Sequence, residues 1–306
     1  MLVPLRLRLA SGLPLALAVP FTVFVWCFTL GPLLDGTEGV TRAFHAAGPF
    51  GALVVLVLAL EVPLLAMALV STGMERRVPL SAMLGLATLP WMLGLMGTEV
   101  LVDRALAALP RLDVVEAGVV LAASTGEAMA PRLLGAWTST ALLMGVALGL
   151  VLAHFGSASV REDAGHRGRG LLLASGVSAS LASVAMVGAL EARHLLGFLT
   201  GLARMPESER AELIAAGLAA TANLRALRWT FTGVLAVLGL TLMARRAGED
   251  SHTPLGWSAR LVPATAVAVL LVLDAHPVSS ATENAPVAIP AGHGEVPAPG
   301  MTASPS

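Results

Sequence analysis

Two long apolar stretches decide the class of this protein: LSAMLGLATLPWMLGLMGTEV over Leu80–Val100 and LLGAWTSTALLMGVALGLVLAHF over Leu133–Phe155. A helix of about 20 apolar residues is long enough to cross the hydrocarbon core of a bilayer. Both stretches reach that length, so we expect two membrane-spanning helices joined by a more polar connection.

The composition of the whole chain agrees with a membrane protein. Apolar residues make up 56% of the chain and charged residues 13%, and the mean hydropathy is +0.80. We therefore expect an all-α fold, a polytopic integral membrane helical bundle surrounded by the lipid bilayer. The net charge of -1 argues against a nucleic-acid partner, because phosphate binding needs a clustered basic surface.

Further apolar stretches predict about seven spans in a transmembrane domain over 1–275. The spans lie near 13–34, 49–70, 79–98, 133–154, 171–190, 229–244 and 261–275. The first could also be a cleaved signal peptide, but its apolar run continues past the point where a signal core should stop, so we favour a span. Residues 276–306 are rich in Pro, Ala and Ser, which predicts a disordered tail.

Arginines mark one side of the predicted bundle. They occur in the short loops after the second, fourth and sixth spans, as Arg76-Arg77, Arg161 and Arg245-Arg246. Loops rich in basic residues stay in the cytoplasm. We therefore predict a multi-pass protein of the cell inner membrane with a cytoplasmic N-terminus and a C-terminal tail outside.

A repeated helical hairpin is a second prediction. At a constant offset of 92, the third and fourth spans align with the fifth and sixth, placing Glu99 on Glu191, Trp137 on Trp229 and Thr138 on Thr230. Repeats of this kind are common in transporters. Coincidence in a chain of low residue diversity is the alternative.

The two long outer connections carry helix-start signals. In the first, Asp113 and Glu116 resemble a capping box; in the second, Pro206 precedes Glu207 and Glu209. We expect short helices on the outer surface, although the Val-rich run after Asp113 also fits a strand.

Glu61 is the principal candidate for chemistry. It stands near the middle of the second span, where an ionisable group costs several kcal/mol unless it is paired, protonated or wetted. Such residues often mark ion pathways. The alternative is a neutral carboxyl that serves only packing and bonds to a carbonyl freed by Pro63.

Other polar residues are weaker candidates. Thr138 and Thr140 would line a water-filled path or bond back to their own helix. The acidic residues expected at the outer boundary would reach water or pair with arginines nearby in the sequence; they are Glu38, Glu99 and Glu191.

Small residues predict close helix packing, within one chain or between copies in a homo-oligomer. Gly145 and Gly149 form a GxxxG pair in the fourth span, and Ser175, Ala179 and Ser183 form a stripe in the fifth.

The sequence contains no pattern of a known catalytic or cofactor site. HExxH, GxSxG, Walker and dinucleotide motifs do not occur, and the single cysteine, Cys27, allows no disulfide within the chain. We expect neither enzymatic activity nor a cofactor or metal.

Two glycine-containing motifs stand out over about residues 49–155: Leu93-Gly94-Leu95-Met96-Gly97-Thr98, and Gly126-Glu127-Ala128-Met129 followed by Gly135. Through them this part of the chain resembles the MotA/TolQ/ExbB proton-channel family. Leu93-Gly94-Leu95-Met96-Gly97-Thr98 matches the Leu-Gly-Leu-Leu-Gly-Thr-Val motif of the family's second helix. Gly126-Glu127-Ala128-Met129 approximates the Gly-Ile-(Ala/Ser)-Glu-Ala-Leu motif of its third helix, and Gly135 stands at a later family glycine.

The chain also departs from this family. Only a few residues separate the second and third spans, where the family has a substantial cytoplasmic region. Arg132 stands where the family places a pore threonine. Glu99 replaces an apolar residue, and family members normally have three spans.

The resemblance implies an energy-transducing, proton-conducting channel subunit that moves a partner, assembled around a single-span protein carrying an Asp. Thr98 would then face the proton path, and the burial argument adds Glu61. A small-solute transporter built from hairpin repeats and a structural scaffold for envelope proteins are the alternatives.

Overall fold

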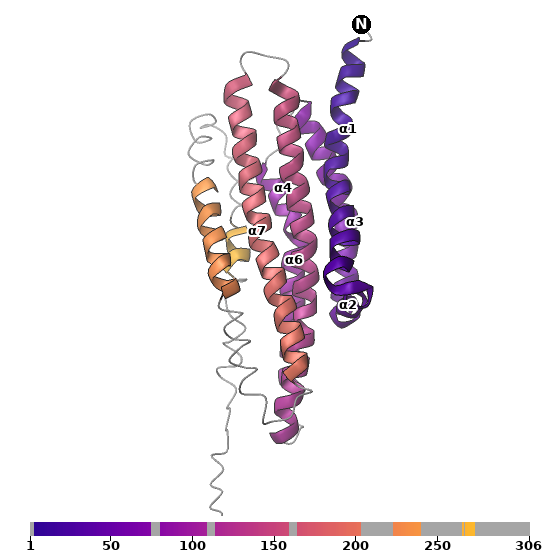
Figure 1. The fold of residues 1–306 in the computed structure, drawn as a ribbon, viewed down its shortest axis with the longest axis vertical. Coiled ribbons are helices and arrows are strands. Elements are labelled where there is room, and N and C mark those ends of the chain that lie inside the picture. The colour runs from indigo at the N-terminus through magenta and orange to yellow at the C-terminus, as the bar shows by residue number, and fades with distance from the viewer. Residues whose placement is uncertain are drawn as a thin grey trace, which may run out of the picture. The chain divides into compact units, whose positions relative to one another are not determined.

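The computed structural model describes residues 3–74, 80–108, 114–158, 164–202, 223–239, 265 and 267–272. Residues 1–274 form one compact unit and 275–306 a second. Every regular element in the described part of the first unit is a helix (Figure 1). The all-α prediction agrees with this part of the chain, whereas the predicted tail lies outside the described residues.

The N-terminal segment is a continuous helical path in three parts. α1 (Val3–Phe24) passes into a π-helix, η1 (Val25–Leu30), and α2 (Gly31–Ala47) follows without a loop. The first apolar span covers Gly12–Leu30 and therefore ends before the predicted 34. Gly48 then reverses the chain with a φ of 56°, a backbone conformation that glycine adopts without steric cost.

The next two apolar spans begin where the sequence predicts. α3 (Pro49–Gly73) starts with Pro49 at its first position, where the missing N–H costs nothing. α4 (Leu80–Ala87) and α5 (Leu89–Ala108) meet at Thr88 and together form the third span. This span continues to Ala108, past the predicted end at 98.

Two long helices complete the labelled elements. α6 (Val114–Ala158) has 45 residues and α7 (Ala164–Leu202) has 39. We expected a separate outer helix or strand before a span over 133–154, and this was wrong. The helix runs unbroken through Pro131, although a proline inside a helix removes one backbone donor. Packing of α6 against both α5 and α7 supports it there.

The described residues contain five helices that are long and apolar enough to cross a membrane: Gly12–Leu30, Pro49–Gly73, Leu80–Ala108, Val119–Phe155 and Arg169–Leu202. The prediction of seven spans is not confirmed. Residues 223–239 are helical and overlap the sixth predicted span, and the helical residues 267–272 fall within the seventh. The rest of those two stretches, and Pro206 with its neighbours, lie outside the described residues.

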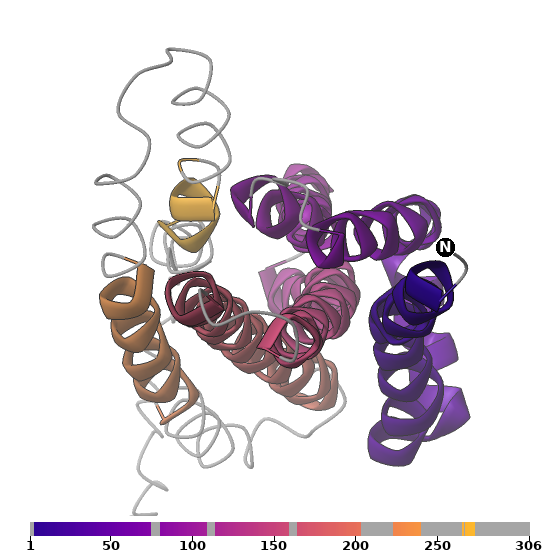
Figure 2. The same cartoon turned by 90° about the horizontal axis from the view of Figure 1, so that it is seen from above.

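Contacts between helices fix their relative directions. Trp26 of η1 lies 5.1 Å from Trp137 of α6, measured between ring centroids, while Val19 of α1 lies against Gly145. The α1–η1 path is therefore antiparallel to α6. Leu143 and Ala147 of α6 accept hydrogen bonds from α7 in reverse order along the chain, so these two helices are antiparallel as well (Figures 1 and 2).

α6 and α7 share a seam of small residues. Ser178 donates to Leu143 O at 2.7 Å, and Ser175 donates to Ala147 O at 3.0 Å. Among the buried positions of α7, one series follows alternating steps of four and three: Ala174, Ser178, Leu181, Ala185, Gly188 and Ala192. This heptad spacing is that of helices packed side by side, and small residues let their backbones approach closely.

The outward faces of the helices are also apolar. On α3, large exposed side chains recur on the face opposite the core; they are Leu53, Leu56, Leu60, Leu64 and Met67. A helix that is hydrophobic all round is typical of a membrane span. Together with the five apolar helices, these faces are compatible with an integral membrane protein.

Candidate functional site

Glu61 faces the interior of the bundle. It is 2% exposed and lies on the same face of α3 as Val54, Leu65 and Leu69, all of which are buried. The helix places it midway between Pro49 and Gly73, so about 18 Å of helix separates it from either end. Its carboxyl therefore lies deep inside the most hydrophobic span instead of facing lipid.

The carboxyl of Glu61 has no hydrogen-bond partner among the described residues, at either oxygen. The expected alternative, a bond to a carbonyl freed by Pro63, is not formed. Pro63 would free the carbonyl of Ala59, and both residues lie on the exposed side of α3. A buried polar group without a partner is costly, so packing alone gives no reason for a carboxyl at this position.

α5 and α6 cross with their backbones in contact. A Cβ atom added to Gly94 would lie 2.5 Å from the carbonyl oxygen of Pro131, and one added to Gly135 would overlap the carbonyl oxygen of Pro90. A Cβ at Gly97 would lie 2.7 Å from Phe50 Cγ on α3. Gly94, Gly97 and Gly135 therefore all lie at the α5–α6 contact.

Thr98 follows directly on this crossing. Its side chain is buried, and its Oγ1 has no hydrogen-bond partner within the described ranges. Because Gly97 lies beside Phe50, Thr98 is level with the first turn of α3. Glu61 is therefore about 16 Å further along the bundle.

The hydroxyls of α6 are mostly used within the protein. Thr138 donates to Leu134 O at 2.8 Å, and Thr140 donates to Ala136 O at 2.8 Å. Ser139 instead accepts from the backbone N–H of Trp91 at 3.0 Å. Trp91 lies in the first turn of α5, where backbone donors lack partners within the helix, so Ser139 caps α5 from a neighbouring helix.

Glu191 is the centre of a buried charge cluster that joins three helices. Arg228, on the helix over 223–239, donates from Nη1 to Glu191 Oε2 at 2.7 Å. Arg132 of α6 places Nη2 at 3.7 Å from the same oxygen, and Arg225 places Nη2 at 4.0 Å from Oε1. Glu191, Arg132 and Arg228 are almost fully buried, whereas the Arg225 side chain is 46% exposed.

The cluster lies at the level where α3 begins. Arg132 follows Pro131, which contacts Gly97, so it is level with Thr98 and with the start of α3. Leu238 contacts Gly176 on α7, so the helix over 223–239 runs antiparallel to α7. Glu191 thereby ties this helix to α6 and α7 at one level.

The other predicted acidic residues are placed differently. Glu99 is exposed on α5. Glu38 lies on α2, in a part of that helix where only the backbone is described. Of the residues predicted at the outer boundary, Glu99 is therefore exposed and Glu191 is buried.

The sequence prediction missed the basic half of the cluster. Arg132 was noted only as a departure from the family pattern, and Arg225 and Arg228 were not considered. A signal was present, because all three arginines stand directly before predicted apolar spans. Ionisable residues that enter the membrane usually face the bundle interior and pair with one another.

The small residues singled out in the sequence lie at several contacts. Gly145 lies against Val19 of α1 and Gly149 against Leu69 of α3. Ser175 lies at the α6–α7 seam, whereas Ser183 donates to Ala179 O in its own helix at 2.9 Å.

No group of three or more His, Cys, Asp or Glu side chains that could hold a metal lies within the described part of the chain. Comparison of the chain with protein-family models, with curated proteins and with solved structures found no match.

Proposed function

We propose that this chain is a proton-conducting, energy-transducing channel subunit of a bacterial inner membrane, with its N-terminus in the cytoplasm. The observation that carries the proposal is the inward-facing Glu61, buried at mid-depth without a hydrogen-bond partner in the described structure. A carboxyl in that position can bind and release a proton, and ionisable groups within spans commonly serve ion pathways.

The α5–α6 contact supports the same proposal. Gly94, Gly97 and Gly135, which carry the resemblance to the MotA/TolQ/ExbB family, are the residues that let the two backbones touch. Thr98 lies beside this contact with a buried hydroxyl. On this proposal Thr98 faces the proton path at the outer end, and Glu61 holds the proton deeper in the membrane.

Arg132 is the feature that sets this chain apart from the family pattern. It stands where a pore threonine is expected, and its charge lies 3.7 Å from Glu191. We infer that the Arg132–Glu191 pair fixes the outer end of the path, and that the proton passes on the side of Thr98.

Proton flux into membrane vesicles tests the proposal. Inverted vesicles from the source bacterium keep any single-span partner in place, and a pH-sensitive dye reports acidification driven by an imposed potential. Flux should require this chain and should fall at least tenfold with Glu61→Gln and with Thr98→Ala. Glu99→Gln is the matched control, because Glu99 neighbours Thr98 on α5 but is exposed. Normal flux in the Glu61 and Thr98 variants, at unchanged protein level, would reject the proposal.

A small-solute transporter is the second candidate, and the charge cluster favours it. Arg132 lies in the first predicted hairpin repeat, while Glu191 and Arg228 lie in the second, so the cluster bridges the two repeats. Substrate sites of repeat-built transporters lie between repeats. The charge cluster lies level with the first turn of α3, whereas the substrate sites of such transporters lie near mid-depth. The transporter is therefore the weaker candidate. Saturable solute uptake by the purified chain in liposomes, lost in Arg132→Leu, would support it.

A further inference from the structure

The third span is interrupted between α4 and α5. Thr88, which separates the two helices, shares its backbone N–H between Leu84 O at 3.2 Å and Gly85 O at 3.3 Å. Its Oγ1 donates to Gly85 O at 2.9 Å. Two residues later Pro90 has no N–H, so it cannot donate to the carbonyl oxygen of Leu86, four residues before it. The α4–α5 break therefore leaves Leu86 O without its helical donor.

A side chain of α6 supports this break. Ser139 has no exposed surface, and its Oγ accepts the backbone N–H of Trp91 at 3.0 Å. In a continuous helix this N–H would donate to Ala87 O. The bond to Ser139 therefore favours the break over a continuous third span.

Glu61 lies at the level of the α4–α5 break. α3 and the third span form an antiparallel hairpin with a short connection, and α3 packs against both α4 and α5. Phe50, near the start of α3, lies against Gly97. Eleven residues lead from Phe50 to Glu61, and eleven lead from Gly97 back to Leu86. The carboxyl and the Leu86 carbonyl are therefore at one depth, on adjacent helices.

The polar atoms at this depth are hydrogen-bond acceptors. Both oxygens of Glu61 lack a partner among the described residues. The Thr88 hydroxyl donates to Gly85 O but keeps its acceptor lone pairs. Glu61 and Thr88 are 2% and 1% exposed. Acceptors that cannot bond to one another are bridged by a donor, and a buried water donates two hydrogen bonds to such groups.

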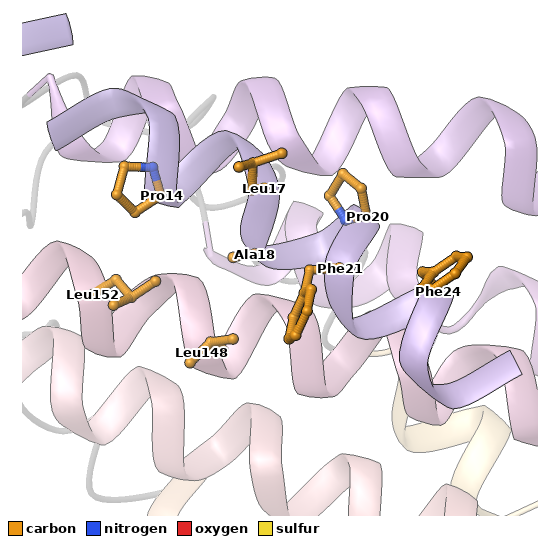
Figure 3. Close-up of a pocket in the computed structure, with 8 residues that line it drawn as sticks. All are labelled: Pro14, Leu17, Ala18, Pro20, Phe21, Phe24, Leu148 and Leu152. Carbon is orange, nitrogen blue, oxygen red and sulfur yellow. The ribbon is translucent and has the colours of Figure 1, made fainter. Parts of the chain in front are cut away.

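The groove between α1 and α6 has a different character. Figure 3 shows Phe21 directed from α1 toward α6, and Leu148 and Leu152 directed from α6 toward α1. All lining side chains are hydrocarbon, so the groove offers a water molecule none of the two to four polar partners that it needs. The acceptors at the α4–α5 break do offer such partners.

We propose that a water molecule binds at the α4–α5 break, bridges Glu61 to Leu86 O, and delivers protons to Glu61. A hydronium at this site gives its proton to the carboxylate: one O–H bond breaks, one forms, and a neutral water remains. Ser139 is a positioning residue, because it acts through the break. The delivery step rests on the proposed proton conduction, whereas the water site does not.

Infrared difference spectroscopy of the purified full chain in micelles tests the water site. The C=O band of protonated Glu61 is the one lost in Glu61→Gln, and a hydrogen bond from water lowers its frequency. Pro90→Ala supplies the N–H that Leu86 O lacks, so the bridge should be lost and the band should move to higher frequency. Pro63→Ala, which removes an exposed proline from α3, should leave the band unchanged.

A second variant closes the break from the other side. Ser139→Ala frees the Trp91 N–H to bond within the third span, so it should shift the band in the same direction. The matched control is Ser183→Ala, since the Ser183 hydroxyl donates within its own helix. An unchanged band in both Pro90→Ala and Ser139→Ala would overturn the water site.

Proton flux in inverted vesicles tests the delivery step. Flux should fall at least tenfold in Pro90→Ala and Ser139→Ala and stay unchanged in the two controls. A shifted band with normal flux would overturn proton delivery by this water. A shifted band in a chain that carries no flux even when unmodified would reject the proposed function and support the water site.

Discussion

Arg228 donates a hydrogen bond to Glu191 over 2.7 Å between two helices, and both side chains are almost completely buried. Arg132 approaches the same carboxylate oxygen from a third helix. One carboxylate therefore holds α6, α7 and the helix over 223–239 at a common level.

Replacing Glu191 by Gln should destabilise the bundle by about 3 kcal/mol, because the arginines stay buried while the carboxylate they contact is lost. The free energy of unfolding is measured by titrating SDS into micelles and following far-UV circular dichroism. Glu99→Gln removes the same charge from an exposed site on α5 and should change stability by less than about 0.5 kcal/mol. Equal losses in the two variants would show that the cluster does not hold the helices together.

The partners of Glu191 could not be predicted from its neighbours in the sequence. We expected Glu191 to reach water or to pair with arginines nearby in the sequence. Arg132 and Arg228, which contact it, are far along the chain, in helices whose packing no local pattern specifies.

Replacing Gly94 by Ala should force α5 and α6 apart. The added Cβ would meet the backbone oxygen of Pro131 at 2.5 Å, and backbone atoms cannot rotate away as a side chain can. Overpacking of this kind costs about 1–3 kcal/mol. Gly197→Ala is the control, since the described structure leaves open space around a Cβ there. If Gly94→Ala unfolds at the same SDS concentration as its control, the two helices are not in backbone contact.

The α6–α7 seam should be equally sensitive to size. Ala185 lies on the heptad spacing with no exposed surface, so Ala185→Leu places three extra carbons between close-packed helices and should cost about 1–3 kcal/mol. Ala52→Leu puts the same side chain on the exposed face of α3 and should be nearly neutral. Thermal unfolding in micelles compares the two. Similar melting temperatures would mean that the seam is loose.

The start of α3 could be predicted from the sequence, whereas the residues of the α6–α7 seam could not. Apolar composition placed the start of α3 correctly, because bilayer thickness and Pro49 both constrain it. The small-residue stripe was predicted at steps of four, through Ser175, Ala179 and Ser183. A step of four residues turns about 40° beyond a full helical turn, so this stripe drifts off the seam, whereas alternating steps of four and three follow it.

The extent of α6 was also beyond a local prediction. We expected a short surface helix or a strand after Asp113, because a short helix and a continuation of the span have the same periodicity. Contact with α5 and α7 decides between them, and Pro131 does not interrupt the helix.

Replacing Glu61 by Leu separates a functional carboxyl from a structural one. The carboxyl lacks a hydrogen-bond partner in the described structure, so a leucine of similar size should raise the free energy of unfolding by about 1–3 kcal/mol. Proton flux in inverted vesicles should fall at least tenfold in the same variant. Glu127→Leu is the control for losing one negative charge, since Glu127 is exposed on α6. A carboxyl kept only for packing would give the reverse pattern, in which Glu61→Leu lowers stability and leaves flux intact. Gain of stability with loss of flux is the outcome we expect, because a membrane span keeps a costly polar group where its chemistry is used.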